Sequence, residues 1–273
     1  MAAIALALGA SLAWGASDFV AGLKSRQLAV IWVLLVSQAT GLVLASAAAI
    51  GTGEPLPSLH AVAWGSAAGL AELIGFAAFY RALAVGAMAV VSPLSATAAI
   101  VPLFVGLVDG QVPTTVQALG MALALGGAAL VSTEPGSRTA AGVGLAIIAA
   151  LAFGLFFVGI DHAADDGALW AVTLTRAAPV AVLAAAVLVL RPAPLGRPAI
   201  APLAGIGALD TGANVMFAAA LTVGTVGIVS VLGSLYPLAT VILARAVLRE
   251  HVSGQQRTGV LAALAGIALV SFA

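Results

Sequence analysis

The stretch ALAVGAMAVVSPLS, residues 82–95, returns 138 residues later as ALTVGTVGIVSVLG, residues 220–233. Seven of the fourteen aligned positions are identical. The match reaches towards both ends of the chain, because GMALALGGAALVS (120–132) aligns with GVLAALAGIALVS (259–271), and LAWG (12–15) aligns with LAFG (151–154). The sequence therefore predicts two homologous halves, residues 1–136 and residues 137–273.

The composition places these halves in a lipid bilayer. The chain is 63% hydrophobic and 7% charged, whereas soluble domains average about 25% charged residues. The net charge is zero, so the basic surface that binds nucleic acid is not expected. The chain has no cysteine, and its three histidines are far apart in sequence, so neither a metal site nor a cofactor is predicted.

Apolar runs of about 20 residues, the length that crosses a bilayer, predict the fold class. We expect an all-α membrane protein with ten transmembrane helices, joined by short connections that leave no room for a soluble domain. The predicted spans are residues 3–22, 28–51, 61–81, 86–108, 115–133, 140–160, 168–190, 199–221, 225–247 and 256–272.

The positive charges predict an orientation. Lys24 and Arg26 follow the first span, Arg191 and Arg197 follow the seventh, and the even-numbered connections contain no lysine or arginine. By the positive-inside rule the odd-numbered connections are cytoplasmic. We therefore expect a multi-pass protein of the plasma (inner) membrane with both termini outside.

Five spans per half is an odd number, so the second half enters the membrane from the opposite side. Such inverted repeats are common in secondary transporters, which bind substrate near the midplane between the halves. An alternative left open by the repeat is a larger helical bundle without transport activity.

Three groups of residues resemble the drug/metabolite transporter superfamily, in its EamA-type ten-helix branch. The first is LAWG (12–15) with Phe19 and Val20, and the second is FYRAL (79–83) followed by VSPL (91–94). The third is SLYP (234–237) with Thr240, followed by EHVS (250–253), Gln256 and Gly259. The resemblance covers essentially the whole chain through the order, spacing and duplication of these motifs.

The resemblance implies a permease that exports small organic metabolites or amino acids, without nucleotide hydrolysis or catalysis. One position departs from the family pattern. The family often has a glutamate after the fourth helix as well as after the ninth, and here Glu250 fills the second position while Gln111 fills the first.

Ionisable residues within a span are functional candidates, because each costs at least about 2.5–3.5 kcal/mol to insert. Glu72 and Asp210 lie in the middle of spans three and eight, at equivalent positions of the two halves. Two such carboxyl groups facing one cavity would suit proton exchange or binding of an amine. Phe76 and Asn214, four residues further on, share their helical faces. A structural, ion-paired role is the alternative.

Arg176 in span seven is the third ionisable candidate. It would bind a substrate carboxylate or pair with Glu72 or Asp210. Asp18 is expected near the cytoplasmic end of span one, either as a gate residue or as an interfacial charge that pairs with Lys24, and we favour the interfacial charge. Tyr80 and Arg81 are expected to anchor span three at the membrane surface.

Further cavity residues are predicted in spans one, four and nine. Trp14 is expected to face the cavity from span one. Ser92 with Pro93, and Ser230 with Tyr236 and Pro237, predict interrupted helices, because proline removes a backbone hydrogen bond and the freed carbonyls can line a polar cavity.

Together these features predict a secondary transporter that works by alternating access around a central midplane site. The expected substrate is a small organic molecule such as an amino acid or a related amine, with proton coupling in a monomer or weak homo-oligomer. Two rivals remain: a non-transporting membrane assembly protein, and an intramembrane enzyme, which would need a nucleophile or metal ligands at midplane depth.

Overall fold

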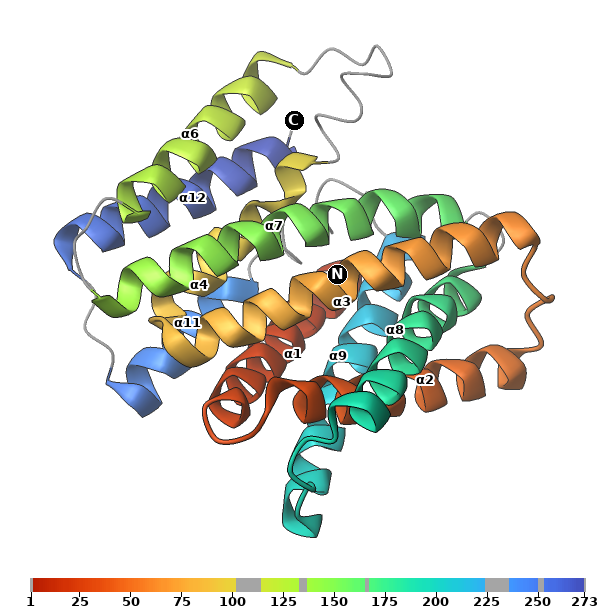
Figure 1. Cartoon of the computed structure of the whole chain (residues 1–273). Helices are drawn as coiled ribbons and strands as arrows, with labels where there is room; N and C mark the ends of the chain where they lie inside the picture. The colour runs from red at the N-terminus through yellow and green to blue at the C-terminus, as the bar shows by residue number, and fades with distance from the viewer. Residues whose placement is uncertain are drawn as a thin grey trace.

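The computed structural model describes residues 2–101, 114–132, 137–164, 167–223, 236–249 and 253–272. Every regular element in these ranges is helical (Figure 1). The helices are α1 (Ala2–Ser25), α2 (Val30–Thr52), α3 (Leu59–Val85), α4 (Met88–Ser95), the 3-10 turn η1 (Ala96–Ala99), α6 (Thr115–Ser132), α7 (Ser137–Ala164), α8 (Ala168–Leu190), α9 (Arg197–Val223), α11 (Tyr236–Leu248) and α12 (Gly254–Phe272).

The helices match the predicted spans. Within the described ranges, α1, α2, α3, α7, α8 and α9 are long and apolar enough to cross a membrane. Helices α6 and α12 coincide with the predicted spans 115–133 and 256–272. The predicted spans 86–108 and 225–247 lie partly outside the described residues, and their described parts form α4, η1 and α11.

Local sequence explains where the helices begin and end. The Ser58 side chain accepts the Ala61 N–H at 3.2 Å and caps the start of α3. Gly53 closes α2 in the left-handed conformation, with a φ of 71°. Arg191, its equivalent in the second half, closes α8 with a φ of 45°. Span four changes from an α-helix to a 3-10 turn after Ser95, so it is interrupted, although the α-helix itself continues through Pro93.

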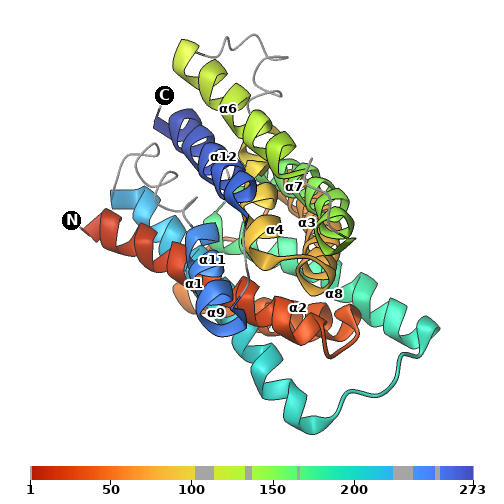
Figure 2. The same ribbon diagram turned by 90° about the vertical axis from the view of Figure 1, so that its left-hand side faces the viewer.

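The two halves are inverted with respect to each other. Equivalent helices α6 and α12 lie side by side (Figures 1 and 2). Gly127 approaches the Gly259 carbonyl of α12, and Gly266 approaches the Gly120 carbonyl of α6. The two contacts are repeat-related, because Gly127 is equivalent to Gly266 and Gly120 to Gly259. Residue numbers rise along α6 where they fall along α12. Equivalent segments therefore run antiparallel, so the protein is an all-α membrane protein built from two inverted five-helix repeats.

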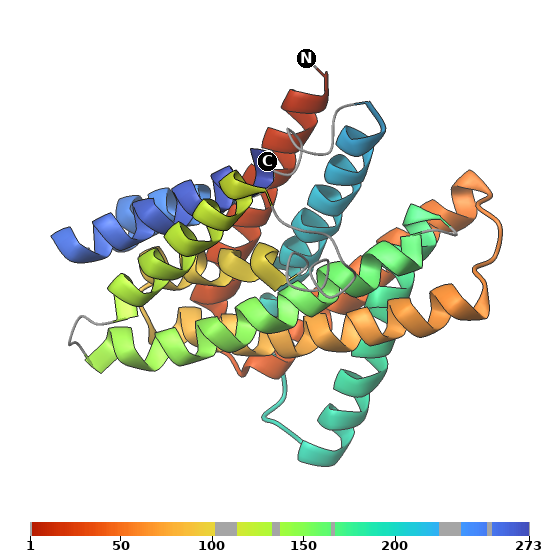
Figure 3. The same ribbon diagram turned by 90° about the horizontal axis from the view of Figure 1, so that it is seen from above.

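The same two-fold relation organises the rest of the bundle. Helix α3 packs along α7, and its counterpart α9 packs along α1, as Figure 3 shows for both pairs. Phe79 meets Phe153 with ring centroids 5.8 Å apart, and the equivalent rings of Phe217 and Trp14 are 5.3 Å apart. Helices α2 and α8 pack on each other between these pairs, next to the axis that relates the halves.

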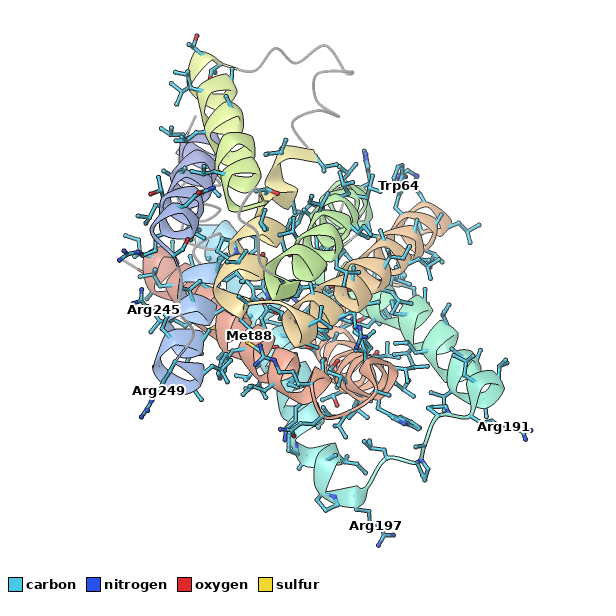
Figure 4. The ribbon with its side chains drawn as sticks, turned by 60° about the vertical axis from the view of Figure 1, so that its left-hand side comes forward. Trp64, Met88, Arg191, Arg197, Arg245 and Arg249 are labelled. Carbon is cyan, nitrogen blue, oxygen red and sulfur yellow. The ribbon has the colours of Figure 1, made fainter. Side chains whose placement is uncertain are left out.

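The bundle has two different ends. At one end Arg26 donates to the carbonyls of Leu83 and Gly86, and Trp32 donates to the carbonyl of Ala193. These hydrogen bonds link the 26–29 connection and the start of α2 to the 86–87 and 191–196 connections. We call this end the Arg191 face. At the other end, the Glu54 face, the 53–58 connection contacts the start of α8. Figure 4 shows Arg191, Arg197 and Arg249 pointing outward along one edge of the bundle, with Trp64 on the opposite side.

Candidate functional site

A charged cluster occupies the centre of the molecule. The Arg176 guanidinium donates through Nη1 to Glu72 Oε1 and Oε2, both at 2.9 Å, and to Gln38 Oε1 at 2.8 Å. Its Nη2 donates to Asp210 Oδ2 at 2.7 Å. Asn214 Nδ2 donates to the same Asp210 oxygen at 3.4 Å. Arg176 therefore bridges both predicted carboxylates.

The cluster is shielded from solvent to different degrees. The side chains of Arg176 and Glu72 are 2% and 4% exposed, whereas that of Asp210 is 15% exposed. Removing one partner of a buried ion pair costs about 3–5 kcal/mol, because the remaining charge loses its counter-ion. The pairing explains how these charges are tolerated at membrane depth, and it leaves Asp210 as the accessible member.

The cluster consists of two repeat-related pairs. Gln38 and Arg176 are equivalent residues on α2 and α8, and Glu72 and Asp210 are equivalent residues on α3 and α9. The four side chains therefore surround the two-fold axis. Each half contributes one carboxylate, but only the second half contributes a cation.

Glycines bring these helices close enough for the side chains to meet. A side chain at Gly69 on α3 would collide with the Thr175 carbonyl of α8, and one at Gly207 on α9 would collide with the Ser37 carbonyl of α2. Gly69 and Gly207 are equivalent, as are Ser37 and Thr175. Small residues allow such close helix packing in lipid. Ser37 and Thr175, whose carbonyls would be hit, each come one residue before a member of the cluster, Gln38 or Arg176.

A cavity of about 10 Å³ adjoins the cluster. This is about the smallest space that holds one water molecule. Its wall combines a carboxylate, an amide and aromatic rings, and is formed by Ser37, Gln38, Phe76, Tyr80, Ile206, Gly207 and Asp210.

Aromatic side chains form two groups: Phe76 and Tyr80 are in the cavity wall, whereas Trp14 and Tyr236, which were expected there, are not among its residues. Phe76 packs on Tyr80 at 5.2 Å and on Phe153 at 5.1 Å between ring centroids. Trp14 contacts Phe217 and lies 6.4 Å from Tyr236. The Thr240 hydroxyl donates to the Gly15 carbonyl at 3.1 Å, which joins α11 to α1 beside Trp14.

Two expectations about α1 and α3 are wrong. Tyr80 is not a surface anchor, because it is 2% exposed and within electrostatic reach of Glu72, Arg176 and Asp210. Arg81, the next residue, is exposed as predicted. Asp18 is not an interfacial charge, because it is 7% exposed and within electrostatic reach of Asp210 and Tyr236. The α1 face bearing Ser17 and Asp18 packs towards α9, since Ser17 donates to the Ile206 carbonyl.

The structure brings most of the predicted residues together. Glu72, Asp210, Arg176 and Asn214 form one hydrogen-bonded cluster, and Phe76 is in the cavity wall. Trp14 and Tyr236 form an aromatic pair between α1 and α11. Ser92 is fully buried in α4 and is not among the residues of this cavity wall. Ser230 lies outside the described residues.

Gln38 was missed from sequence, although one signal was available. An amide in the apolar run VLLVSQATGLV (33–43) draws no attention through charge. The offset of 138 residues that relates Glu72 to Asp210 also relates Gln38 to Arg176. Within the described ranges, no group of three or more histidine, aspartate or glutamate side chains is arranged to bind a metal.

Comparison with known proteins agrees with the fold. A crystal structure of another protein superposes with a TM-score of 0.63 at 17% sequence identity, covering 98% of this chain and 96% of that one. No curated protein sequence matched. The model of the EamA-like transporter family matches twice, over residues 1–133 and 140–272. Because these matches cover nearly the whole chain, the protein belongs to the EamA-like transporter family.

Proposed function

We propose that this protein is a secondary transporter that moves small organic cations, above all amines, across the membrane by alternating access at the central cluster. Family membership supports a membrane transporter of small molecules. The observation that carries the narrower proposal is the charge of the cluster. Glu72 and Asp210 share one cation, Arg176, and Asp18 lies within electrostatic reach of Asp210, so carboxyl groups outnumber cations.

Arg176 is already paired with two carboxylates, which argues against a substrate carboxylate as its ligand. Its two terminal nitrogens already donate to Glu72, Asp210 and Gln38. Its Nε–H has no hydrogen-bond partner in the described part of the structure, so the case against a substrate carboxylate is one of charge: it would add negative charge beside Glu72 and Asp210. Sequence alone allowed an amino acid or a related amine, and the excess of carboxyl groups over cations supports an amine.

The cavity wall supports a cationic ligand directly. Asp210 is the charged residue of this wall, and the rings of Phe76 and Tyr80 form part of the same wall. A cation above an aromatic face gains about 0.5–2 kcal/mol, the larger value applying when it is desolvated. A carboxylate flanked by aromatic rings therefore suits an ammonium group.

The excess of carboxyl groups also suggests how transport of the substrate is coupled to protons. Carboxylates in excess at membrane depth need a positive charge, which either a proton or the substrate cation can supply. If the proton and the substrate cation compete for the same carboxylates, the site that returns across the membrane without substrate carries a proton. A proton gradient directed inward would then drive the cation outward, which makes the protein an exporter.

Access to the cluster requires movement of the helices. A cavity of about 10 Å³ is far smaller than an organic amine, so the site must open before binding. The inverted repeat supplies two related arrangements, because exchanging the conformations of the two halves exchanges the face to which the site opens. The transporter is proposed to act in the plasma membrane, with the Arg191 face cytoplasmic.

A ligand screen on the purified protein tests this proposal. We expect primary amines and quaternary ammonium compounds to raise the melting temperature, and amino acids and carboxylates to leave it unchanged. The shift should disappear in Asp210→Asn, which removes the accessible carboxylate, and persist in Asp210→Glu, the residue that the first half has at this position. Stabilisation by carboxylates alone would refute the cation proposal. No shift with any compound would favour the non-transporting assembly protein.

A further inference from the structure

Two repeat-related tryptophans make similar hydrogen bonds at opposite faces of the molecule, with acceptors that differ by one residue in the repeat alignment. At the Glu54 face, Trp170 Nε1 donates to the Glu54 carbonyl at 3.2 Å. At the Arg191 face, Trp32 Nε1 donates to the Ala193 carbonyl at 2.9 Å. Trp32 and Trp170 are 138 residues apart, the same offset that relates Glu72 to Asp210.

Each bond joins a helix start to the connection that follows its partner helix. Trp32 is the third residue of α2 and binds the 191–196 connection after α8. Trp170 is the third residue of α8 and binds the 53–58 connection after α2. Since α2 and α8 pack on each other, the pair is fastened at both membrane faces.

The same helices contain two of the central residues. Gln38 follows Trp32 by six residues on α2, and Arg176 follows Trp170 by six residues on α8. Six helical residues span roughly 9 Å. The intervening stretches, VLLVS and AVTLT, contain neither glycine nor proline, so each helix should transmit a displacement of its first turn to its central residue.

The two fastenings differ in strength. The Glu54 carboxylate also accepts the backbone N–H of Trp170 at 3.3 Å, so the Glu54 face has two hydrogen bonds. In the second half the position of Glu54 is occupied by Pro192, which has no such side chain. The bond at the Arg191 face depends on the indole alone.

We infer that Trp32 and Trp170 are the two gate latches of this transporter. Each latch holds its own face closed, and opening of a face requires release of the indole at that face. The latch at the Glu54 face is the stronger of the two, because it has two hydrogen bonds between α8 and the 53–58 connection. The latches are positioning residues that act through α2 and α8 on Gln38 and Arg176, and their role rests on the proposed transport function.

Single-cysteine labelling tests this inference cleanly, because the chain has no cysteine of its own. Ser37→Cys places a thiol in the cavity wall. Its reaction with a membrane-impermeant maleimide is compared between right-side-out and inside-out vesicles. Leu56→Cys, at a side chain that is 83% exposed on the 53–58 connection, identifies the vesicle side that bears the Glu54 face.

Phenylalanine substitutions remove the N–H and keep a ring. In the Ser37→Cys background, Trp170→Phe should raise labelling from the Glu54 face relative to the Arg191 face, and Trp32→Phe should change the ratio in the opposite direction. Loss of one hydrogen bond corresponds to a shift on the order of 2- to 10-fold. Trp64→Phe is the matched control, because Trp64 stacks on His162 at the Glu54 face, 4.4 Å between ring centroids, and its ratio should not change.

Opposite shifts are the signature of latches, since a merely structural role would destabilise both accessible states alike. Shifts in the same direction, or unchanged ratios in two variants that melt like the parent, would overturn the inference. Flux measurements separate this result from the transport proposal. If the ratios shift but no cation crosses the membrane, the transport proposal fails; if cations cross but the ratios stay fixed, only the latch inference fails.

Discussion

At the scale of single residues, the central feature is one arginine shared by two repeat-related carboxylates. Sequence reasoning found Glu72, Asp210 and Arg176, because a charge inside an apolar span is conspicuous. It misplaced Tyr80 and Asp18, because their exposure depends on which helix packs beside them. A span pattern gives depth in the membrane but not the direction in which a side chain points.

Arg176→Gln tests whether the arginine holds the cluster together. Glutamine is the residue of the first half at this position, and the substitution leaves two buried carboxylates without a cation. We expect the free energy of unfolding to fall by about 3 kcal/mol. Adding Glu72→Gln should recover part of this loss, because only one carboxylate then lacks a partner.

Melting curves in detergent for the four members of this double-mutant cycle measure the coupling. Additive losses would show that Arg176 and Glu72 do not stabilise each other. The conservative variant Glu72→Asp, the residue of the second half, retains the charge and serves as the control.

At the scale of helices, sequence predicted the spans well and their contacts less well. Apolar length located α1, α2, α3, α7, α8 and α9, because membrane thickness fixes the length of a spanning helix. The pairing of α3 with α7 and of α1 with α9 was not predicted. Such pairing depends on small residues whose partners lie far away in sequence, as where Gly75 of α3 meets Phe153 of α7.

Close helix packing at Gly69 and Gly207 should be essential for the site. Alanine at either position would collide with a backbone carbonyl of α8 or α2. We expect each substitution to lower the free energy of unfolding by about 1–3 kcal/mol, the usual cost of overpacking. It should also weaken cation binding, because Arg176 and Gln38 would move away from the carboxylates.

Gly205 and Gly212 on α9 provide matched controls. No atom lies within 4 Å of the point where a Cβ would stand at either position. Alanine there should leave stability unchanged or raise it by about 0.5–1 kcal/mol through helix propensity. Thermal melting and ligand titration check both sets. If Gly207→Ala behaves like Gly205→Ala, the helices do not need this contact.

At the scale of the whole molecule, the duplicated sequence predicted the architecture. An odd number of spans in each repeat requires inversion, and the antiparallel contact between α6 and α12 shows it. The proposed substrate class could not be read from the repeat, because the proposal rests on the question of how Arg176 is paired. Only the three-dimensional arrangement answers that question.

The proposed orientation of the whole molecule rests on the charges at the Arg191 face. We expect a reporter fused to the C-terminus and active only in the cytoplasm to be silent, because the basic connections should be cytoplasmic. The same reporter fused after Arg191 should be active and is the matched control. Activity at the C-terminus with silence at Arg191 would reverse the assignment.

The decisive measurement is the flux of organic cations in proteoliposomes, which tests proton-driven transport at the central cluster. Organic cations, including quaternary ammonium compounds that cannot cross lipid uncharged, are loaded inside vesicles and a proton gradient is imposed from outside. We expect efflux that accelerates with the proton gradient. It should fall at least about 10-fold in Glu72→Gln and in Asp210→Asn, and both variants should still insert into the membrane. Absence of flux for every cation, or equal flux in both variants and the parent, would contradict this expectation.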